Sequence, residues 1–169
     1  MPDAAAHGPA PWKGRRLHVL GIAGAGMSGL AVLAAGLGAE ITGSDRSESR
    51  YLPAVREAGI DVRIGEDPAD LPDGDDLVVV SSTAIPETHP QRAEARRRGL
   101  PDLSRHGLLG EICAVHRVIA VAGAHGKTTT SAMVVHALRG AGGDPSYLVG
   151  GILQATGRNV HVGTSGWLV

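Results

Sequence analysis

The chain has 169 residues and a formal net charge of −1, and 43% of its residues are hydrophobic while only 2% are aromatic. This near-neutral charge argues against a surface that attracts nucleic acid or anionic lipid in bulk. Because the chain has no Phe, its core must be built from Val, Leu, Ile and Ala, which suits α/β layers better than an aromatic-rich β-sandwich.

The first fourteen residues, 1–14, are rich in Pro, Ala and Gly and lack an apolar stretch of signal-peptide length. We expect them to form a disordered tail. No run reaches the roughly 18 apolar residues that a membrane-spanning helix needs, so no membrane partner is expected. The single cysteine, Cys113, cannot form an intrachain disulfide, which favours a reducing, cytoplasmic setting. Its apolar surroundings favour simple packing over a reactive thiol.

From residue 16 onward, apolar runs typical of strands alternate with helical segments. We expect strands at residues 16–22, 39–45, 60–65, 77–82, 117–123, 146–153 and 167–169. We expect helices at 27–37, 51–59, 90–99, 104–116 and from the loop after residue 123 to about Arg139. Gly99 is placed to end one helix as its C′ residue, and Ser104 to cap the next. Such alternation predicts βαβ units and a mostly parallel sheet.

The pattern restarts after residue 116, which predicts two α/β units in tandem. The first, residues 15–114, is expected to be a Rossmann-like parallel-sheet domain. The second, residues 115–169, is expected to be the beginning of a P-loop α/β domain. The chain ends within the apolar run 167–169, and a strand with nothing after it is a poor natural end. We therefore expect a fragment that is cut early in its second domain.

A glycine-rich turn follows the first predicted strand and opens the first predicted helix. It fits G-x-G-x-x-G with Gly24, Ala25, Gly26, Met27, Ser28 and Gly29. Gly24 would allow the tight turn, Gly26 would let a pyrophosphate approach, and Gly29 would let the helix pack closely on the sheet. Asp45 ends the second predicted strand, where a carboxylate can reach a ribose hydroxyl. The alternative is a tight turn without a ligand, with Asp45 in an ordinary polar turn.

A second loop, residues 123–128, reads Gly-Ala-His-Gly-Lys-Thr and ends like a phosphate-binding loop. It is shorter than a strict Walker A motif, because Val121 stands where the first glycine belongs. Its backbone N–H groups would form an anion nest, with the positive charge of Lys127 near the β- and γ-phosphates. The Thr128 hydroxyl is placed to ligate Mg²⁺. Lys127 is one of two lysines against fourteen arginines, which favours a specific role.

Three further polar positions are weaker candidates. Ser81, Ser82 and Thr83 follow a buried strand at the carboxyl edge of the predicted sheet, where ligands of open α/β sheets bind. Capping of the strand end explains them equally well. His125 is more readily interpreted as a hydrogen-bonding or packing residue than as an acid or base. The one cysteine and the scattered histidines have no zinc-ligand spacing.

Taken together, these motifs resemble the Mur ligase family of bacterial peptidoglycan synthesis. The segments that carry the resemblance cover nearly the whole chain after the tail, and in order they are GIAGAGMSGLA, SDRSES, VVVSSTAIPETHP, IAVAGAHGKTTTSAM and GGIL…GRNVHVG. The resemblance implies a cytoplasmic ligase that uses ATP and Mg²⁺. It would phosphorylate the carboxylate of UDP-N-acetylmuramate, and the amine of L-alanine would attack the acyl phosphate to form an amide. Without the family's remaining segments, we expect the chain alone to be inactive.

The resemblance also assigns roles to residues of this chain. The ATP loop would consist of Gly123, Ala124, His125, Gly126, Lys127, Thr128 and Thr129. Within it, Lys127 and Thr128 would be catalytic, and Thr128 would also ligate Mg²⁺. The UDP-sugar would contact Gly24, Ala25, Gly26, Met27, Ser28, Asp45 and Ser82, with Asp45 near the uridine.

The chain departs from the family pattern at four positions. The resemblance leads us to expect Thr where Ala124 stands, Asn at His89, His at Glu66 and Glu at Gly107. Three other functions stay open: a related ligase that recycles murein peptides, an NAD-dependent Rossmann oxidoreductase, and a non-catalytic nucleotide-binding module. The NAD hypothesis explains the first glycine turn but gives Lys127 no role.

Overall fold

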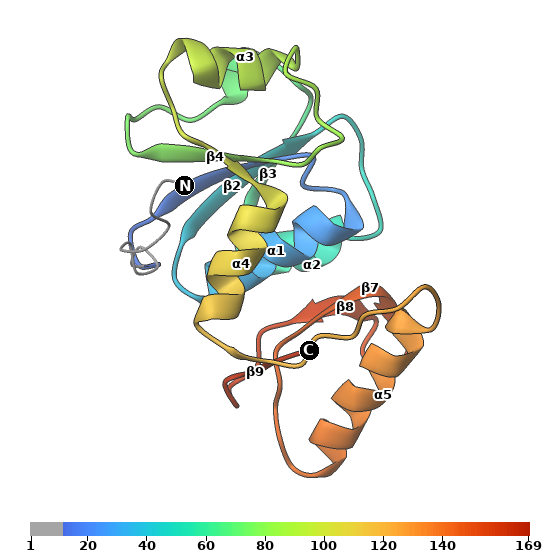
Figure 1. Cartoon of the computed structure of the whole chain (residues 1–169). Coiled ribbons are helices and arrows are strands. Elements are labelled where there is room, and N and C mark those ends of the chain that lie inside the picture. Colours follow the sequence, from blue (N-terminus) through green and yellow to red (C-terminus); the bar gives the residue numbers. More distant parts are fainter. Residues whose placement is uncertain (1–11) are drawn as a thin grey trace, which may run out of the picture.

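The first half of the chain is built on a five-stranded parallel sheet, in a computed structural model that describes residues 12–169 (Figure 1). Its strand order is β3-β2-β1-β4-β5. The bounds are β1 Arg16–Leu20, β2 Glu40–Asp45, β3 Asp61–Ile64, β4 Leu77–Ser81 and β5 Asp102–Ser104. Apolar side chains of the central strands, such as Leu17 and Val79, have no exposed surface, as expected for strands covered on both faces.

Helices cover both faces of this sheet (Figure 1). On one face lie α1 Ala25–Gly36, α2 Leu52–Glu57 and α4 Arg105–Ala114. On the other lie α3 Pro90–Arg97 and the short 3-10 helix η1 Pro68–Asp70. The prediction of an α/β fold with a parallel sheet is confirmed. Of the five strands in this sheet, only β5 was not predicted, because three residues with polar ends carry no apolar signal.

The second half holds one helix and four short strands. They are β6 Arg117–Val118, α5 Lys127–Gly140, β7 Tyr147–Leu153, β8 Arg158–His161 and β9 Trp167–Leu168. The strands form two pairs, β6 with β9 in parallel and β7 with β8 as an antiparallel hairpin. A parallel bridge between Ser146 and Leu168 connects the two pairs. The strand predicted at 117–123 is therefore mostly wrong. After Ile119 donates its N–H to the Leu168 carbonyl at 2.8 Å, no neighbouring strand extends the ladder among the described residues.

Both predicted helix signals are confirmed. The Ser104 hydroxyl accepts the Gly107 N–H at 3.0 Å and so caps α4. Gly99 has a φ of 71° after the end of α3, and Leu100 N–H then bonds to the Ala95 carbonyl at 2.9 Å. This bond, together with the left-handed backbone of Gly99, is the Schellman motif that a C′ glycine permits.

The predicted tail is wrong at its inner end. Residues 1–11 lie outside the described part of the chain, but Trp12 is only 8% exposed and belongs to the main core. Arg15 stacks over its ring at 5.4 Å and pairs with Glu111 of α4. The composition of this segment gave no indication that the large apolar side chain of Trp12 packs in the core.

Helix α1 lies between the five-stranded sheet and the β7–β8 hairpin (Figure 1). The sequence predicted that Gly29 would let α1 pack closely on the five-stranded sheet, but this residue faces the β7–β8 hairpin instead. A Cβ at Gly29 would collide with Leu148 of β7, and its next contact would be Val160 of β8 at 3.6 Å. None of the helices in residues 12–169 has both the length and the hydrophobicity that crossing a bilayer requires.

Candidate functional site

The first candidate site lies where the sheet changes winding direction. From β1 the chain moves to β2 and β3 on one side, whereas β4 leads to β5 on the other. The loops that follow β1 and β4 meet here, since a Cβ at Gly21 would lie 3.3 Å from Ile85 Cδ1. Ligands of open α/β sheets bind at such a switch point, outside the carboxyl ends of the strands.

The glycine turn places the N-terminus of α1 at this point. Gly24 is the N-cap, with extended backbone and no side-chain cap, and Ser28 N–H makes the first helical bond to its carbonyl at 2.9 Å. The amides of Ala25, Gly26 and Met27 therefore have no partner within the helix. Together with the helix dipole, they form a cradle for an anion.

Two predicted site residues take part in this turn through their backbone alone. The Met27 and Ser28 side chains are 5% and 1% exposed. The Ser28 hydroxyl donates to the Ala25 carbonyl at 3.1 Å inside the helix. A ligand at the turn would meet the backbone here, not these side chains.

Asp45 lies at the turn but is already engaged. Its Oδ2 accepts the Ala23 N–H at 2.9 Å, and its Oδ1 accepts the Ser47 N–H at 3.3 Å. Ser49 donates its hydroxyl to the Ala23 carbonyl at 2.7 Å. Asp45 and Ser49 thus bind the backbone N–H and the carbonyl of Ala23, so in this structure Asp45 stabilises the turn.

Ser82 borders an open hollow of about 350 Å³ at the carboxyl ends of β4 and β5. Its hydroxyl accepts the Ala84 N–H at 3.3 Å, which is the local turn bond that serine commonly makes. Residues that line the hollow include Ser82, Thr83, Arg92, Ser104, Arg105 and His106. The buried Ser81 instead donates to Asp102 at 2.7 Å.

Sequence reasoning missed Arg105. Its Nη1 would lie 3.1 Å from a Cβ at Gly26, so its guanidinium covers the glycine turn. The side chain is exposed and takes part in none of the ion pairs found in residues 12–169. The sequence did contain a signal for Arg105, because it lies in the first turn of α4. A positive charge at this end of a helix is unfavourable next to the helix dipole. Such an arginine suggests a bound anion.

The second candidate site is the loop before α5. Gly123 and Gly126 have φ values of 151° and 77°, which favour glycine. Lys127 folds back over the loop, where its Nζ donates to the Gly123 carbonyl at 2.7 Å and to the Ala124 carbonyl at 3.3 Å. All residues from 122 to 130, His125 included, are exposed. The ammonium therefore lies within the loop, open to solvent.

Helix α5 begins as α1 does. Its N-cap is Gly126, which provides no side-chain hydrogen bond, and the first helical bond is from Thr130 N–H to the Gly126 carbonyl at 2.9 Å. The amides of Lys127, Thr128 and Thr129 are left without helical partners. By contrast, Ser104 caps α4 with its own hydroxyl. The two glycine-capped helices thus leave their first amides without a side-chain partner, so these amides can bind an anion.

Thr128 lies against a glycine pair on β7. A Cβ at Gly150 would be 3.4 Å from Thr128 Oγ1, and one at Gly151 would be 3.4 Å from Thr128 Cγ2. No cluster of three His, Cys, Asp or Glu residues that could bind a metal exists within residues 12–169. The exposed Thr128 hydroxyl fits a Mg²⁺ that arrives with phosphate groups, because phosphate oxygens and water would complete its coordination.

Two of the departures from the family pattern face each other. His89 Nε2 lies 3.4 Å from Glu66 Oε1, and Arg46 approaches the same oxygen at 3.5 Å. The His89 side chain is only 7% exposed. Its Nδ1 is buried and finds no hydrogen-bond partner in the described part of the chain. These two substitutions therefore form one pair on neighbouring loops.

The chain is similar to known ligases along most of its length. A model of the Mur ligase family, catalytic domain, matches residues 16–117. A UDP-N-acetylmuramate–L-alanine ligase of Acidothermus cellulolyticus is 49% identical over 149 residues, which is 88% of this chain and 31% of that protein. The enzyme of the same name from Nocardia farcinica is 46% identical over 153 residues, 89% of this chain and 30% of that protein.

Solved structures are also similar. The UDP-N-acetylmuramate-alanine ligase of Thermotoga maritima superimposes with a TM-score of 0.81 at 27% identity, covering 90% of this chain and 36% of that one. A murein peptide ligase from Psychrobacter arcticus gives 0.81 at 31% identity, covering 92% and 37%. The chain spans about a third of the length of the curated relatives it matches.

Proposed function

The chain belongs to the Mur ligase family, and from that membership we propose that it contains the two nucleotide sites of an ATP-dependent UDP-N-acetylmuramate–L-alanine ligase. The observation that carries the proposal is the pair of glycine-capped helix N-termini, one of them with a lysine folded over it. On this proposal residues 15–114 form the UDP-sugar domain and residues 115–169 belong to the P-loop ATP-binding domain. ATP and UDP-sugars are cytoplasmic metabolites, so we place the reaction in the cytoplasm.

The first cradle would hold the diphosphate of UDP-N-acetylmuramate. The amides of Ala25, Gly26 and Met27 point out of the helix and would bind phosphate oxygens. The Arg105 guanidinium beside Gly26 would neutralise their charge. We propose that Asp45 and Ser82 contact the UDP-sugar on its uridine side. Each stabilises a loop at the carboxyl edge of the sheet through a local hydrogen bond.

The second cradle would hold ATP. The Lys127 ammonium would exchange its carbonyl partners for β- and γ-phosphate oxygens, joined by the amides of residues 127–129. The Thr128 hydroxyl would ligate Mg²⁺, which supplies charge neutralisation of the phosphates. A substrate carboxylate oxygen then bonds to the γ-phosphorus while the bond to ADP breaks. The amine nitrogen of L-alanine attacks the acyl carbon, loses a proton, and inorganic phosphate leaves.

This chain would contribute positioning and charge to that reaction. Phosphoryl transfer needs little covalent help from a protein, so holding the two substrates and balancing the developing charge provide most of the catalysis. The reaction brings two anionic substrates together, ATP and UDP-N-acetylmuramate, and each of the two phosphate cradles would bind one of them.

A related reaction is the second candidate. Murein peptide ligases are among the similar structures, with 31% identity and a TM-score of 0.81 for one of them. We favour free L-alanine as the amine because the curated relatives at 45–49% identity are named for it. Family membership removes the support for an NAD-dependent oxidoreductase.

Titration calorimetry on the 169-residue chain tests the proposal. We expect UDP-N-acetylmuramate and Mg·ATP each to bind at one site of their own, and NAD to give no heat. In a longer form that includes the family's remaining segments, phosphate release should depend on both UDP-N-acetylmuramate and the amine. Comparing L-alanine with an L-alanyl peptide as the amine decides between the two ligase reactions. Binding of NAD without any binding of the UDP-sugar would overturn the proposal.

A further inference from the structure

The β7–β8 hairpin contacts the elements that form both cradles. It lies between α1 and α5, the two helices whose N-termini form the candidate sites (Figure 1). The hairpin belongs to neither loop, and sequence reasoning gave it no role beyond one strand. Its contacts with each helix begin close to the anion-binding end.

On the α1 side, the contact is a side-chain hydrogen bond to the glycine turn itself. Asn159 of β8 is 2% exposed, and its Nδ2 donates to the Ala25 carbonyl at 3.0 Å. This carbonyl shares a planar trans peptide unit with the Gly26 N–H, so the two groups point in opposite directions. The Asn159 amide, together with the Ser28 hydroxyl that donates to the same carbonyl at 3.1 Å, therefore holds this peptide so that the Gly26 N–H points out of the helix, into the anion cradle.

Two glycines let the hairpin come close enough for this bond. Besides Gly29, which leaves room for Leu148, Gly36 faces Val162, and a Cβ there would lie 2.6 Å from a valine methyl carbon. A side chain at either position would push the hairpin away from α1. An added ion pair joins Arg158 of β8 to Glu57 of α2.

On the α5 side, the contact is the glycine pair of β7 against Thr128. At Gly150 and Gly151 an added Cβ would lie 3.4 Å from the threonine side chain, an ordinary contact distance, so this side chain faces the strand. Thr128 directly follows Lys127, and its amide belongs to the second cradle. One strand pair therefore contacts the first cradle through Asn159 and the second through Gly150 and Gly151.

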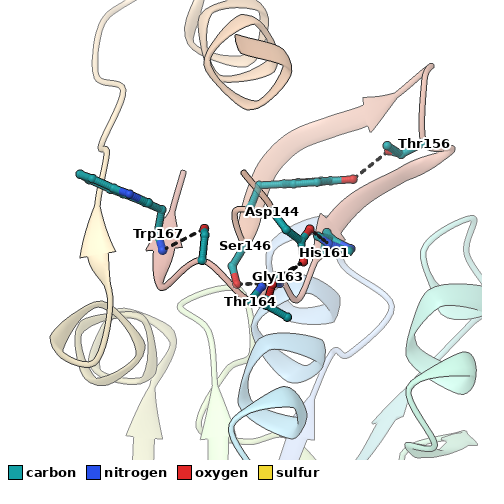
Figure 2. A network of polar contacts seen from close by, with 9 residues as sticks. Asp144, Ser146, Thr156, His161, Gly163, Thr164 and Trp167 are labelled. Atoms are coloured by element: carbon teal, nitrogen blue, oxygen red, sulfur yellow. Dashed lines mark hydrogen bonds and ion pairs between the residues drawn. The ribbon is translucent and has the colours of Figure 1, made fainter. Parts of the chain in front are cut away.

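A network of hydrogen bonds connects the two ends of the hairpin at its base, as Figure 2 shows. The Asp144 carboxylate binds His161 Nε2 at 2.8 Å and the Thr164 N–H at 3.0 Å. Ser146 accepts the Gly163 N–H at 2.9 Å. These bonds join the segment before β7 to β8 and the segment after it, so the hairpin is a stiff connection.

We propose that Asn159 is a positioning residue that orients the first phosphate cradle, and that the β7–β8 hairpin couples this cradle to the ATP loop. The inference rests on the proposed function of the two cradles. By reciprocity, Mg·ATP bound at the lysine loop then strengthens binding of the UDP-sugar, and the UDP-sugar strengthens binding of Mg·ATP by the same factor.

The test compares Asn159→Leu with Thr156→Ala in the 169-residue chain. Thr156 bonds to the Tyr147 hydroxyl at 2.8 Å in the same hairpin, and its side chain makes no hydrogen bond to α1 within residues 12–169, so it controls for general loosening of the hairpin. Calorimetry measures the Kd of UDP-N-acetylmuramate with and without Mg·ATP. We expect Asn159→Leu to weaken UDP-sugar binding about tenfold and to abolish the effect of Mg·ATP. The Kd of Mg·ATP alone should stay within twofold.

A spectroscopic measurement keeps the proposal testable if Asn159→Leu folds poorly. In an ¹⁵N-labelled chain, Asn159→Asp and Asn159→Ser should each shift the Gly26 amide signal and leave that of Gly126 in place, whereas Thr156→Ala should move neither. Unchanged UDP-sugar affinity in Asn159→Leu, or a Gly26 signal unaffected by the substitutions, would overturn the inference. Failure of the unsubstituted chain to bind UDP-N-acetylmuramate would instead overturn the proposed function.

Discussion

Lys127 is the residue on which the proposed ATP site depends most. Its ammonium donates to two carbonyls of its own loop and is exposed, so removing it should cost little stability. Lys127→Ala should weaken Mg·ATP binding at least tenfold, because a hydrogen bond to a charged group contributes about 1.5–3 kcal/mol. UDP-N-acetylmuramate binding should stay within twofold, as calorimetry can show.

The chain offers a matched control for that substitution. Lys13 is the other lysine, is also exposed, and lies outside both candidate sites. Lys13→Ala should leave both affinities unchanged. Equal ATP affinity in Lys127→Ala and Lys13→Ala would contradict the assignment of the loop.

The Glu66–His89 pair is a second prediction at the scale of residues. Each stands where the resemblance leads us to expect a different residue, and His89 Nε2 lies 3.4 Å from Glu66 Oε1. Replacing both by the family's residues, as Glu66→His with His89→Asn, should cost less than the sum of the single changes. We expect a coupling of about 0.5–1.5 kcal/mol, measured as the unfolding free energy in urea across the four variants. Strictly additive effects would show that the pair is not coupled.

At the scale of elements, the segment after β8 is held by close backbone contact. A Cβ at Gly163 would lie 2.5 Å from the Pro145 carbonyl carbon, a backbone atom that cannot move aside. Gly163→Ala should therefore lower the free energy of unfolding by roughly 2–3 kcal/mol. Urea unfolding at neutral pH measures the change.

Gly140 at the end of α5 provides the comparison. An added Cβ there would meet nothing within 4 Å, and Ala is the better helix former by about 1 kcal/mol at most. Gly140→Ala should leave stability unchanged or raise it. If both alanine variants behaved alike, the packing argument at Gly163 would be wrong.

Elements with a clear local signal were predicted well. Helix α4, for example, begins at the expected cap Ser104, because capping is decided within four residues. Strand β6 ends at Val118, five residues before the predicted end, although the apolar run continues. A strand exists only where a neighbour pairs with it, and an apolar run does not say where that neighbour is.

At the scale of the whole molecule, the buried His18 predicts how stability depends on pH. His18 lies in β1 at 1% exposure, and its Nδ1 lies 2.8 Å from the Thr42 hydroxyl. Burial lowers its pKa to about 4, with the neighbouring Gln91 side chain acting in the opposite direction. The unfolded chain binds a proton near pH 6.5, whereas the folded chain resists it until about pH 4. The stability contributed by neutral His18 is therefore present above pH 6.5 and lost as the pH falls.

This loss amounts to about 3 kcal/mol at pH 4, since one pKa unit corresponds to about 1.4 kcal/mol. Urea unfolding between pH 7 and pH 4 measures it. His18→Gln keeps a group that can bond to Thr42 but cannot titrate, so its stability should fall less over this range by about that amount. Identical pH profiles for the two proteins would contradict the assignment.

The sequence by itself determined the α/β class, both glycine loops, the helix caps and the family, because each of these is encoded in short stretches of chain. Only the tertiary structure decided which distant residues meet. Asn159 bonds to Ala25 across 134 positions, Arg105 covers Gly26, and Glu66 faces His89. Such pairs arise from how helices and strands pack, and neither periodicity nor spacing along the chain carries that information.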